Sequence, residues 1–237
     1  RAGIADPFLP NKIKAGREDE IRECIGCNIC ISSWHDGVPV RCTQNATAGE
    51  EWRKNWHPEK FNRTSSEDRL LIIGAGPAGL EAALIAAKQG FQVTLSDQSK
   101  NMGGRLNFET ALPGLSTWRR VIDYRLYALK QMNNVDLYSN SELSRDDILE
   151  LGHERVVIAT GAKWTKSLYS SLEIPVGELN QPNVYTPDDI AAGIKINGPV
   201  LVYDFDNYYL GGVLAEKLAA QGLSVSYATP AGHASAW

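Results

Sequence analysis

Residues 70–79 read LLIIGAGPAG, and this stretch decides the fold. Its first four residues form a short apolar run, which suits a strand buried inside a parallel sheet. A Gly-x-Gly-x-x-Gly pattern follows at once, and residues 80–89 then predict an Ala-rich helix that stops at Gly90. Residues 91–97 predict a second strand. The sequence therefore predicts a β-α-β unit within a doubly wound α/β domain.

Each glycine of this pattern has a physical reason. Gly74 permits the tight turn, Gly76 lets a pyrophosphate approach the backbone, and Gly79 lets the helix pack on the strand. The helix N-terminus offers free N–H groups and a partial positive charge to phosphate, and Pro77 is tolerated in its first turn. Asp97, placed eighteen residues after Gly79, can accept hydrogen bonds from an adenosine ribose and disfavours a 2′-phosphate. A Rossmann-like adenine-nucleotide site is the prediction, and a glycine turn without a ligand is the alternative.

Two other turns could reach the same nucleotide. Gly103-Gly104-Arg105 could bring backbone and a cation near it, unless it is a plain turn with a solvated arginine. Thr160-Gly161 ends a predicted strand on the side where doubly wound sheets bind ligands, unless it is an ordinary strand-to-loop turn. The predicted nucleotide-contacting residues are Gly74, Ala75, Gly76, Pro77, Ala78, Gly79, Asp97, Gln98, Gly104, Arg105, Leu106, Thr160 and Gly161.

The chain has four cysteines, at Cys24, Cys27, Cys30 and Cys42. Three thiols at every third residue can wrap a short loop around one centre, and a remote fourth closes the shell, as in a 4Fe–4S cluster. Structural zinc usually takes two separated C-x2-C pairs or pairs with histidine. Disulfides belong mostly to small secreted domains. We therefore predict a cluster, with zinc, disulfides and free thiols as the alternatives.

Composition bounds the remaining classes. The chain has 237 residues, 43% of them hydrophobic, and a formal net charge of −4, which suits one or two domains with real cores. Mild acidity argues against a nucleic-acid partner, and no apolar run is long enough for a membrane span. Reduced thiols favour the cytoplasm. The missing initiator methionine and the end just after a predicted strand suggest an internal piece of a larger protein.

The other predicted elements flank these motifs. Prolines disfavour helix near the N-terminus, and a short helix follows at 17–22. Residues 24–42 form the cysteine loop, and 43–68 a connector with a helix near 48–54. The remaining elements are helices at 116–132 and 146–151, strands at 135–138 and 156–159, a loop containing Pro175, Pro182 and Pro187, and a second β-α-β unit with strands 200–204 and 223–227 around helix 210–221.

The second unit lacks the glycine pattern. Residues 203–212 read YDFDNYYLGG, so Asp204 and Asp206 stand where the first unit accepts phosphate. Because these carboxylates repel phosphate, we expect no working NAD(P)H site here, or a much altered one. The unit also stops after two strands, and such a unit needs further strands and helices to bury its sheet.

Several segments together resemble the iron–sulfur flavoprotein dehydrogenases of the trimethylamine, dimethylamine and histamine dehydrogenase group. They are CIGCNIC at 24–30, CTQN at 42–45, WHPEKF at 56–61, ALPGL at 111–115 and VIATGA at 157–162. The wider family includes 2,4-dienoyl-CoA reductase. The resemblance covers nearly the whole chain.

The resemblance implies a protein with an N-terminal TIM barrel that binds FMN, then a cluster segment and two nucleotide-binding-like domains. In this chain it assigns 1–23 to the tail of the barrel, 24–68 to the 4Fe–4S segment and connector, 69–170 to the ADP- or FAD-binding domain and 171–237 to the start of the degenerate second domain. Arg1 falls where the family has an FMN-phosphate arginine, unless it is a solvated terminal residue. Cys24, Cys27, Cys30 and Cys42 map onto the cluster ligands, and Gly74 to Gly79 with Asp97 onto a site that holds ADP in the amine dehydrogenases and FAD in the reductases.

The departure at 203–210 favours the dehydrogenase branch. Such an enzyme oxidises an amine at FMN and passes electrons through the cluster to an external acceptor, with ADP structural. No catalytic residue is expected in this chain, and His35, His57, His153 and His233 are lone histidines. The expected partners are an electron-transfer flavoprotein, a small amine and a second copy of the chain, without nucleic acid or membrane. The alternatives are an NADPH-dependent 2,4-dienoyl-CoA reductase-type flavoprotein with FAD and a non-catalytic nucleotide module with structural zinc.

Overall fold

The computed structural model describes residues 2–54, 59–169, 175–179 and 181–234. Arg1, with its predicted flavin contact, lies outside this range, and so do residues 56–58 of the resemblance. The chain divides into two compact units, one of Arg1–Thr110 with Thr117–Gly161 and one of Ala111–Ser116 with Ala162–Trp237. Among the described residues, no helix has the length and apolarity that crossing a bilayer requires.

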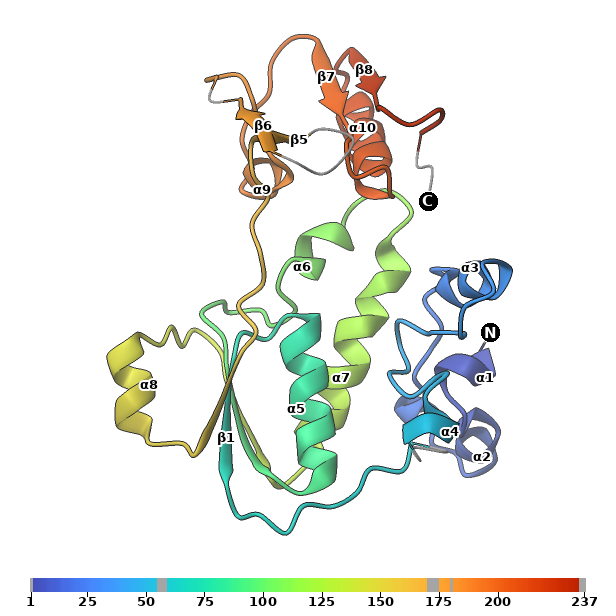
Figure 1. Ribbon diagram of the computed structural model, residues 1–237, viewed down its shortest axis with the longest axis vertical. Helices are drawn as coiled ribbons and strands as arrows, with labels where there is room; N and C mark the ends of the chain where they lie inside the picture. The colour runs from blue at the N-terminus through green and yellow to red at the C-terminus, as the bar shows by residue number, and fades with distance from the viewer. Residues whose placement is uncertain (1, 55–58, 170–174, 180, 235–237) are drawn as a thin grey trace. The chain divides into compact units, whose positions relative to one another are not determined.

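A four-stranded parallel sheet organises the first unit (Figure 1). Its strands are β1 (Arg69–Ile73), β2 (Gln92–Ser96), β3 (Val135–Tyr138) and β4 (Arg155–Ile158), in the order β3-β2-β1-β4. Helices α5 (Pro77–Gln89) and α7 (Arg120–Lys130) lie on one side of the sheet and α8 (Arg145–Leu151) on the other. The predicted doubly wound, Rossmann-like fold is therefore confirmed.

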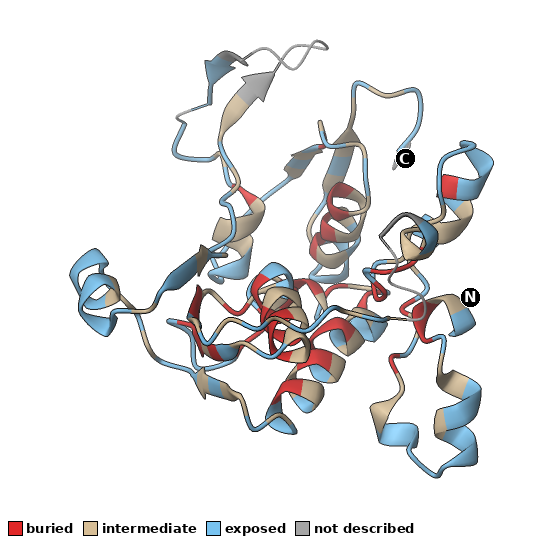
Figure 2. Cartoon of the chain, turned by 60° about the horizontal axis from the view of Figure 1, so that its bottom comes forward, coloured by how far each residue is buried: buried red, intermediate tan, exposed pale blue. Residues whose placement is uncertain are grey.

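The core of this unit forms where α5 and α7 pack on the sheet, and Figure 2 shows the buried residues concentrated there. Leu71, Ile72, Leu80 and Ile122 are fully enclosed. The first two lie on β1, a strand that is apolar on both faces, and the other two lie on α5 and α7. Ile25, between the first two cysteines, is buried in the same core. Burying such a side chain contributes roughly 1.5–3 kcal/mol, so the cysteine segment is anchored to the nucleotide-type domain.

The N-terminal segment is more helical than the sequence predicted. It forms α1 (Ala2–Ala5), α2 (Leu9–Lys14), the 3₁₀ turn η1 (Glu18–Glu20), α3 (Ile29–His35) and α4 (Glu51–Lys54). The expectation that prolines disfavour helix here was wrong, because Pro10 lies in the first turn of α2, where its missing N–H costs nothing. The helix predicted at 17–22 shrinks to η1. Cys30 lies on α3 rather than in a loop.

Asp6 ties this segment together. Its buried carboxylate accepts hydrogen bonds from Lys12 Nζ at 2.6 Å, Arg22 N–H at 2.8 Å and Phe8 N–H at 3.0 Å. Burial alone would raise the pKa of Asp6, but Lys12 and the two backbone donors together lower it below its ordinary value. The stabilisation is therefore complete above the ordinary carboxyl pKa of about 3.9 and is lost as the pH falls through the lower folded-state pKa.

Asp6→Asn is expected to lower the free energy of unfolding by about 2 kcal/mol at pH 7. The deficit relative to the unsubstituted protein should shrink at pH 3, which lies below the ordinary carboxyl pKa of about 3.9, because Asp6 of the unfolded chain then binds a proton more readily than Asp6 of the folded chain. Urea unfolding at both pH values measures this difference. Exposed Asp19→Asn is the control and should change stability by less than about 0.5 kcal/mol. An equal deficit at both pH values would show that the charge of Asp6 does not matter.

The second unit contains the second predicted β-α-β motif. Strands β7 (Val200–Tyr203) and β8 (Val225–Ala228) pair in parallel and are joined by α10 (Leu210–Ala220). The predicted proline loop instead contains an antiparallel pair, β5 (Ser167–Tyr169) with β6 (Pro175–Glu178), and a short helix, α9 (Pro187–Ala191). Thr186 and Asp189 form a capping box at the start of α9, a signal that is readable in the sequence.

Candidate functional site

The glycine loop between β1 and α5 is held by close backbone contacts. Gly74 has a φ of +98°, and a Cβ there would lie 2.4 Å from the carbonyl oxygen of Ala159. A Cβ on Gly79 would lie 1.8 Å from the carbonyl oxygen of Gly74. Neither position has room for a side chain, so both glycines are required by the turn and by the approach of α5 to β1, as predicted from the pattern.

Gly76 differs from these two, because the space beside it is open. The nearest heavy atom to a Cβ built on Gly76 is the Cα of Gly104, at 4.0 Å. Gly103 N–H donates to Ala75 O at 2.8 Å, so the 103–104 turn lies against the glycine loop. Two backbones without side chains thus face each other at the N-terminus of α5, which suits a pyrophosphate.

Asp97 braces this loop from the end of β2. The residue is 8% exposed, and its carboxylate accepts hydrogen bonds from Ala75 N–H at 2.6 Å and Ser99 N–H at 2.7 Å. Each carboxylate oxygen has a second lone pair, so a ribose hydroxyl could still bind. The sequence pointed to the ribose, and the structure adds a contact that holds the loop in place.

The other residues predicted to contact the nucleotide differ in how far they are exposed. Thr160 and Gly161 are exposed just after the end of β4. Before them, Ala159 N–H donates a hydrogen bond to Ile73 O of β1 at 2.7 Å. They therefore lie at the switch point between β1 and β4, where doubly wound sheets bind ligands. Pro77, Ala78 and Gln98 are exposed and Arg105 is half-buried. Leu106 belongs to the hydrophobic core, so its side chain is not available to a nucleotide.

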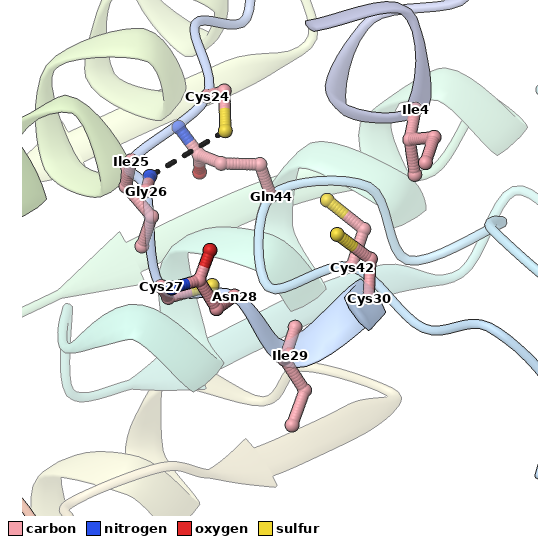
Figure 3. Close-up of a pocket in the computed structure, with 10 residues that line it drawn as sticks. All are labelled: Ile4, Cys24, Ile25, Gly26, Cys27, Asn28, Ile29, Cys30, Cys42 and Gln44. Carbon is pink, nitrogen blue, oxygen red and sulfur yellow. Dashed lines mark hydrogen bonds between the residues drawn. The ribbon is translucent and has the colours of Figure 1, made fainter. Parts of the chain in front are cut away.

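The four cysteines line one pocket, shown in Figure 3 together with Ile4, Ile25, Gly26, Asn28, Ile29 and Gln44. All four are free, half-buried thiols, which contradicts the disulfide alternative. Gly26 and Asn28 have φ values of +73° and +61°, and these two left-handed residues turn the chain around Cys27. Gly26 N–H approaches Cys24 Sγ at 3.4 Å, and Cys27 Sγ lies 3.2 Å from Thr43 Oγ1.

This donor set fits a cluster. Four thiols and three isoleucines surround a pocket, as a four-iron cluster needs, because each thiolate binds a different iron. A single zinc ion would need its ligands to converge within about 2.3 Å of one point. Among the described residues, no group of three or more His, Cys, Asp or Glu side chains is arranged to hold one metal ion.

Helix α7 and the turn before it hold this pocket against the domain core. Arg120 Nη1 donates to the carbonyl oxygen of Cys24 at 3.0 Å, and Thr117 Oγ1 donates to that of Ile25 at 3.4 Å. Arg125, about one turn further along α7, donates a hydrogen bond from Nη1 to Gln44 Oε1. The sequence reasoning missed these supporting residues. One signal was available in the sequence, because Arg125 falls among the apolar positions Val121, Ile122 and Leu129 of the predicted helix.

The second unit carries a carboxylate at its corresponding turn. Asp204, after β7, is 5% exposed and accepts hydrogen bonds from Asn207 N–H and the hydroxyl of Tyr227. It packs against Gly211 in the first turn of α10, where a Cβ would lie 2.6 Å from its Oδ2. Burial and the neighbouring Asp204 charge raise the pKa of Asp206. The carboxylate of Asp204 thus lies at the start of α10, whereas in the first unit the corresponding start of α5 has exposed backbone that can bind phosphate.

Comparison with known proteins defines the class. Residues 68–191 match the family model described as pyridine nucleotide-disulphide oxidoreductase. Since the match covers over half of the chain, the chain belongs to this family, and the prediction of an oxidoreductase is confirmed.

Particular relatives narrow the class. Dimethylamine dehydrogenase of Hyphomicrobium sp. (strain x) is 45% identical over 246 residues, covering 98% of this chain and 33% of the relative. The structure of 6-hydroxypseudooxynicotine amine oxidase from Pseudomonas geniculata N1 matches with a TM-score of 0.94 and 47% identity, covering 100% of this chain and 36% of that one. Histamine dehydrogenase from Rhizobium sp. 4-9 matches with a TM-score of 0.92 and 45% identity, covering 99% and 35%. The predicted resemblance to the trimethylamine, dimethylamine and histamine dehydrogenase group is confirmed, and the chain spans about a third of the length of the curated relatives it matches.

Proposed function

We propose that this chain is the electron-transfer portion of an amine dehydrogenase that contains FMN and a 4Fe–4S cluster. The observation that carries the proposal is the pocket lined by four free thiols in the same compact unit as a glycine loop open to a pyrophosphate. The similarity to dimethylamine and histamine dehydrogenases supports it. Amine oxidation at FMN is assigned to the part of the protein outside this chain.

The residues of the chain have separate tasks in this proposal. Cys24, Cys27, Cys30 and Cys42 would hold the cluster, which supplies one-electron transfer when bound. Ile4, Ile25 and Ile29 line the same pocket and supply apolar side chains to its wall. Arg120 and Thr117 donate to the carbonyl oxygens of Cys24 and Ile25 and so fix the backbone at the start of the cysteine segment. None of these side chains moves a proton.

The nucleotide at the glycine loop is proposed to be ADP with a structural role. Gly76, Gly104 and the N-terminus of α5 would contact the pyrophosphate, and Asp97 the ribose. Asp204 against α10 supports the absence of a working NAD(P)H site in the second unit, and so favours an external electron acceptor over NADPH as donor. An electron-transfer flavoprotein as acceptor, a small amine as substrate, a homodimeric assembly and a cytoplasmic location complete the proposal.

The test is to purify the protein without oxygen and assay its metal, sulfide and released nucleotide. We expect about four iron and four sulfide per chain, with ADP released on denaturation. Release of FAD, together with rapid flavin reduction by NADPH in the full-length protein, would instead identify the reductase branch. One equivalent of zinc without iron or sulfide would end both readings and leave a nucleotide-binding module.

A further inference from the structure

A buried arginine connects helix α5 to the cysteine pocket. Arg125, in the middle of α7, is 3% exposed, and its guanidinium is always charged. Its Nε donates to Glu81 Oε2 on α5 at 2.6 Å, while Nη1 donates to Gln44 Oε1 at 2.8 Å and Nη2 to Gln44 O at 3.3 Å. The ion pair is therefore oriented, with the carboxylate on the Nε edge and the terminal nitrogens directed at Gln44.

Gln44 carries this contact into the wall of the pocket. It lies two residues after Cys42, is 1% exposed and lines the pocket. Its Nε2 donates to the carbonyl oxygen of Glu23, the residue before Cys24, at 3.0 Å. Figure 3 shows its side chain extending toward the side of the pocket where Cys24 and Ile25 lie. One amide thus joins the segment of the last cysteine to that of the first.

This chain of contacts is polarised in one direction. The amide oxygen of Gln44 accepts a hydrogen bond from the Arg125 cation, and the amide nitrogen donates one to the carbonyl oxygen of Glu23. Such hydrogen bonds strengthen one another in a low-dielectric interior. Buried charges are also screened little by salt. Net charge and hydrogen bonding are among the factors that set the potential of an iron–sulfur group. Arg125 places a buried cation against Gln44, a residue of the pocket wall, and such a cation stabilises the reduced form, which carries one more negative charge.

We infer that Arg125 and Glu81, acting through the side chain of Gln44, set the reduction potential of the group in the cysteine pocket. Arg125 raises this potential and Glu81 lowers it. Both are positioning residues, because neither lines the pocket, and among the described residues Arg125 contacts the pocket wall at Gln44. The inference rests on the proposed function, since it needs a redox group held by the four thiols.

The test is a reductive titration of the holo-protein, followed by electron paramagnetic resonance. Arg125→Gln is expected to lower the midpoint potential and Glu81→Gln to raise it. In each case the ratio of reduced to oxidised cluster at a fixed potential should change about tenfold, or about 59 mV for a one-electron couple. Loss of packing alone would not move the two variants in opposite directions. Shifts of the same sign, or no shift, would overturn the inference.

Two further variants keep the test decisive. Arg119→Gln is the matched control, because Arg119 lies on the turn before α7 but donates hydrogen bonds to Asp123 and Asn107. The midpoint potential of this variant should equal that of the unsubstituted protein. Gln44→Met removes the amide at similar volume and should lower the potential. If Arg125→Gln or Glu81→Gln does not fold, Gln44→Met decides, and an unchanged potential overturns the inference. A protein without iron would refute the proposed function instead, and that outcome is visible before any substitution is made.

Discussion

Cys42→Ser is expected to abolish most of the iron and sulfide content of the purified protein, from about four of each per chain to less than one. Cys42 is the remote thiol of the four that line the pocket, twelve residues after Cys30. A serine hydroxyl does not ionise readily and is a poor ligand for iron, so the fourth corner of the shell opens. Metal analysis and the visible absorbance of protein purified without oxygen measure the loss.

Ser33→Ala is the matched control for this substitution. Ser33 is buried on α3, the helix that carries Cys30, but it does not line the pocket. The control variant should keep its full iron content. A Cys42→Ser protein that retained four iron atoms would show that this thiol is not a ligand, and the four-cysteine reading would then be wrong.

The nucleotide-type fold could be predicted because its signals are local. The apolar run at 70–73, the glycines that follow and the stop at Gly90 lie within about twenty residues, and each acts on the backbone beside it. The same locality explains the error near the N-terminus. Pro10 excludes helix only beyond the first turn, and whether it begins a helix depends on neighbours such as Asp6, whose role the sequence does not reveal.

The support of the pocket could not be predicted, because it depends on residues far apart in the chain. Gln44 and Arg125 are separated by 81 positions, and Arg120 and Cys24 by 96. No pattern in the sequence pairs them, since only the packing of α7 against the cysteine segment brings them together. The segment CTQN at 42–45 contributed to the resemblance to the amine dehydrogenases, but it did not indicate a role for Gln44. Asp97 is similar, because its bond to Ala75 N–H exists only once β2 lies beside β1.

Two alanine substitutions within one glycine pattern are expected to have different consequences. Gly79→Ala places a methyl group 1.8 Å from the carbonyl oxygen of Gly74, so α5 must move away from β1. This overpacking should lower the free energy of unfolding by roughly 3 kcal/mol. Gly76→Ala has an ordinary φ of −72° and open space at its Cβ, so it should unfold within about 0.5 kcal/mol of the unsubstituted protein.

Gly76→Ala should instead weaken nucleotide binding, because its methyl group enters the gap between Gly76 and Gly104, where the pyrophosphate approaches the backbone. A loss of at least about tenfold in ADP affinity corresponds to about 1.4 kcal/mol. Urea unfolding and calorimetric titration with ADP on both variants separate the two effects. Gly90→Ala serves as a second comparison, since its φ of +101° strains a side chain at the far end of α5 and should lower stability without changing ADP affinity. If Gly76→Ala bound ADP normally, the pyrophosphate would not lie over this loop, and the nucleotide would have to bind elsewhere in the unit.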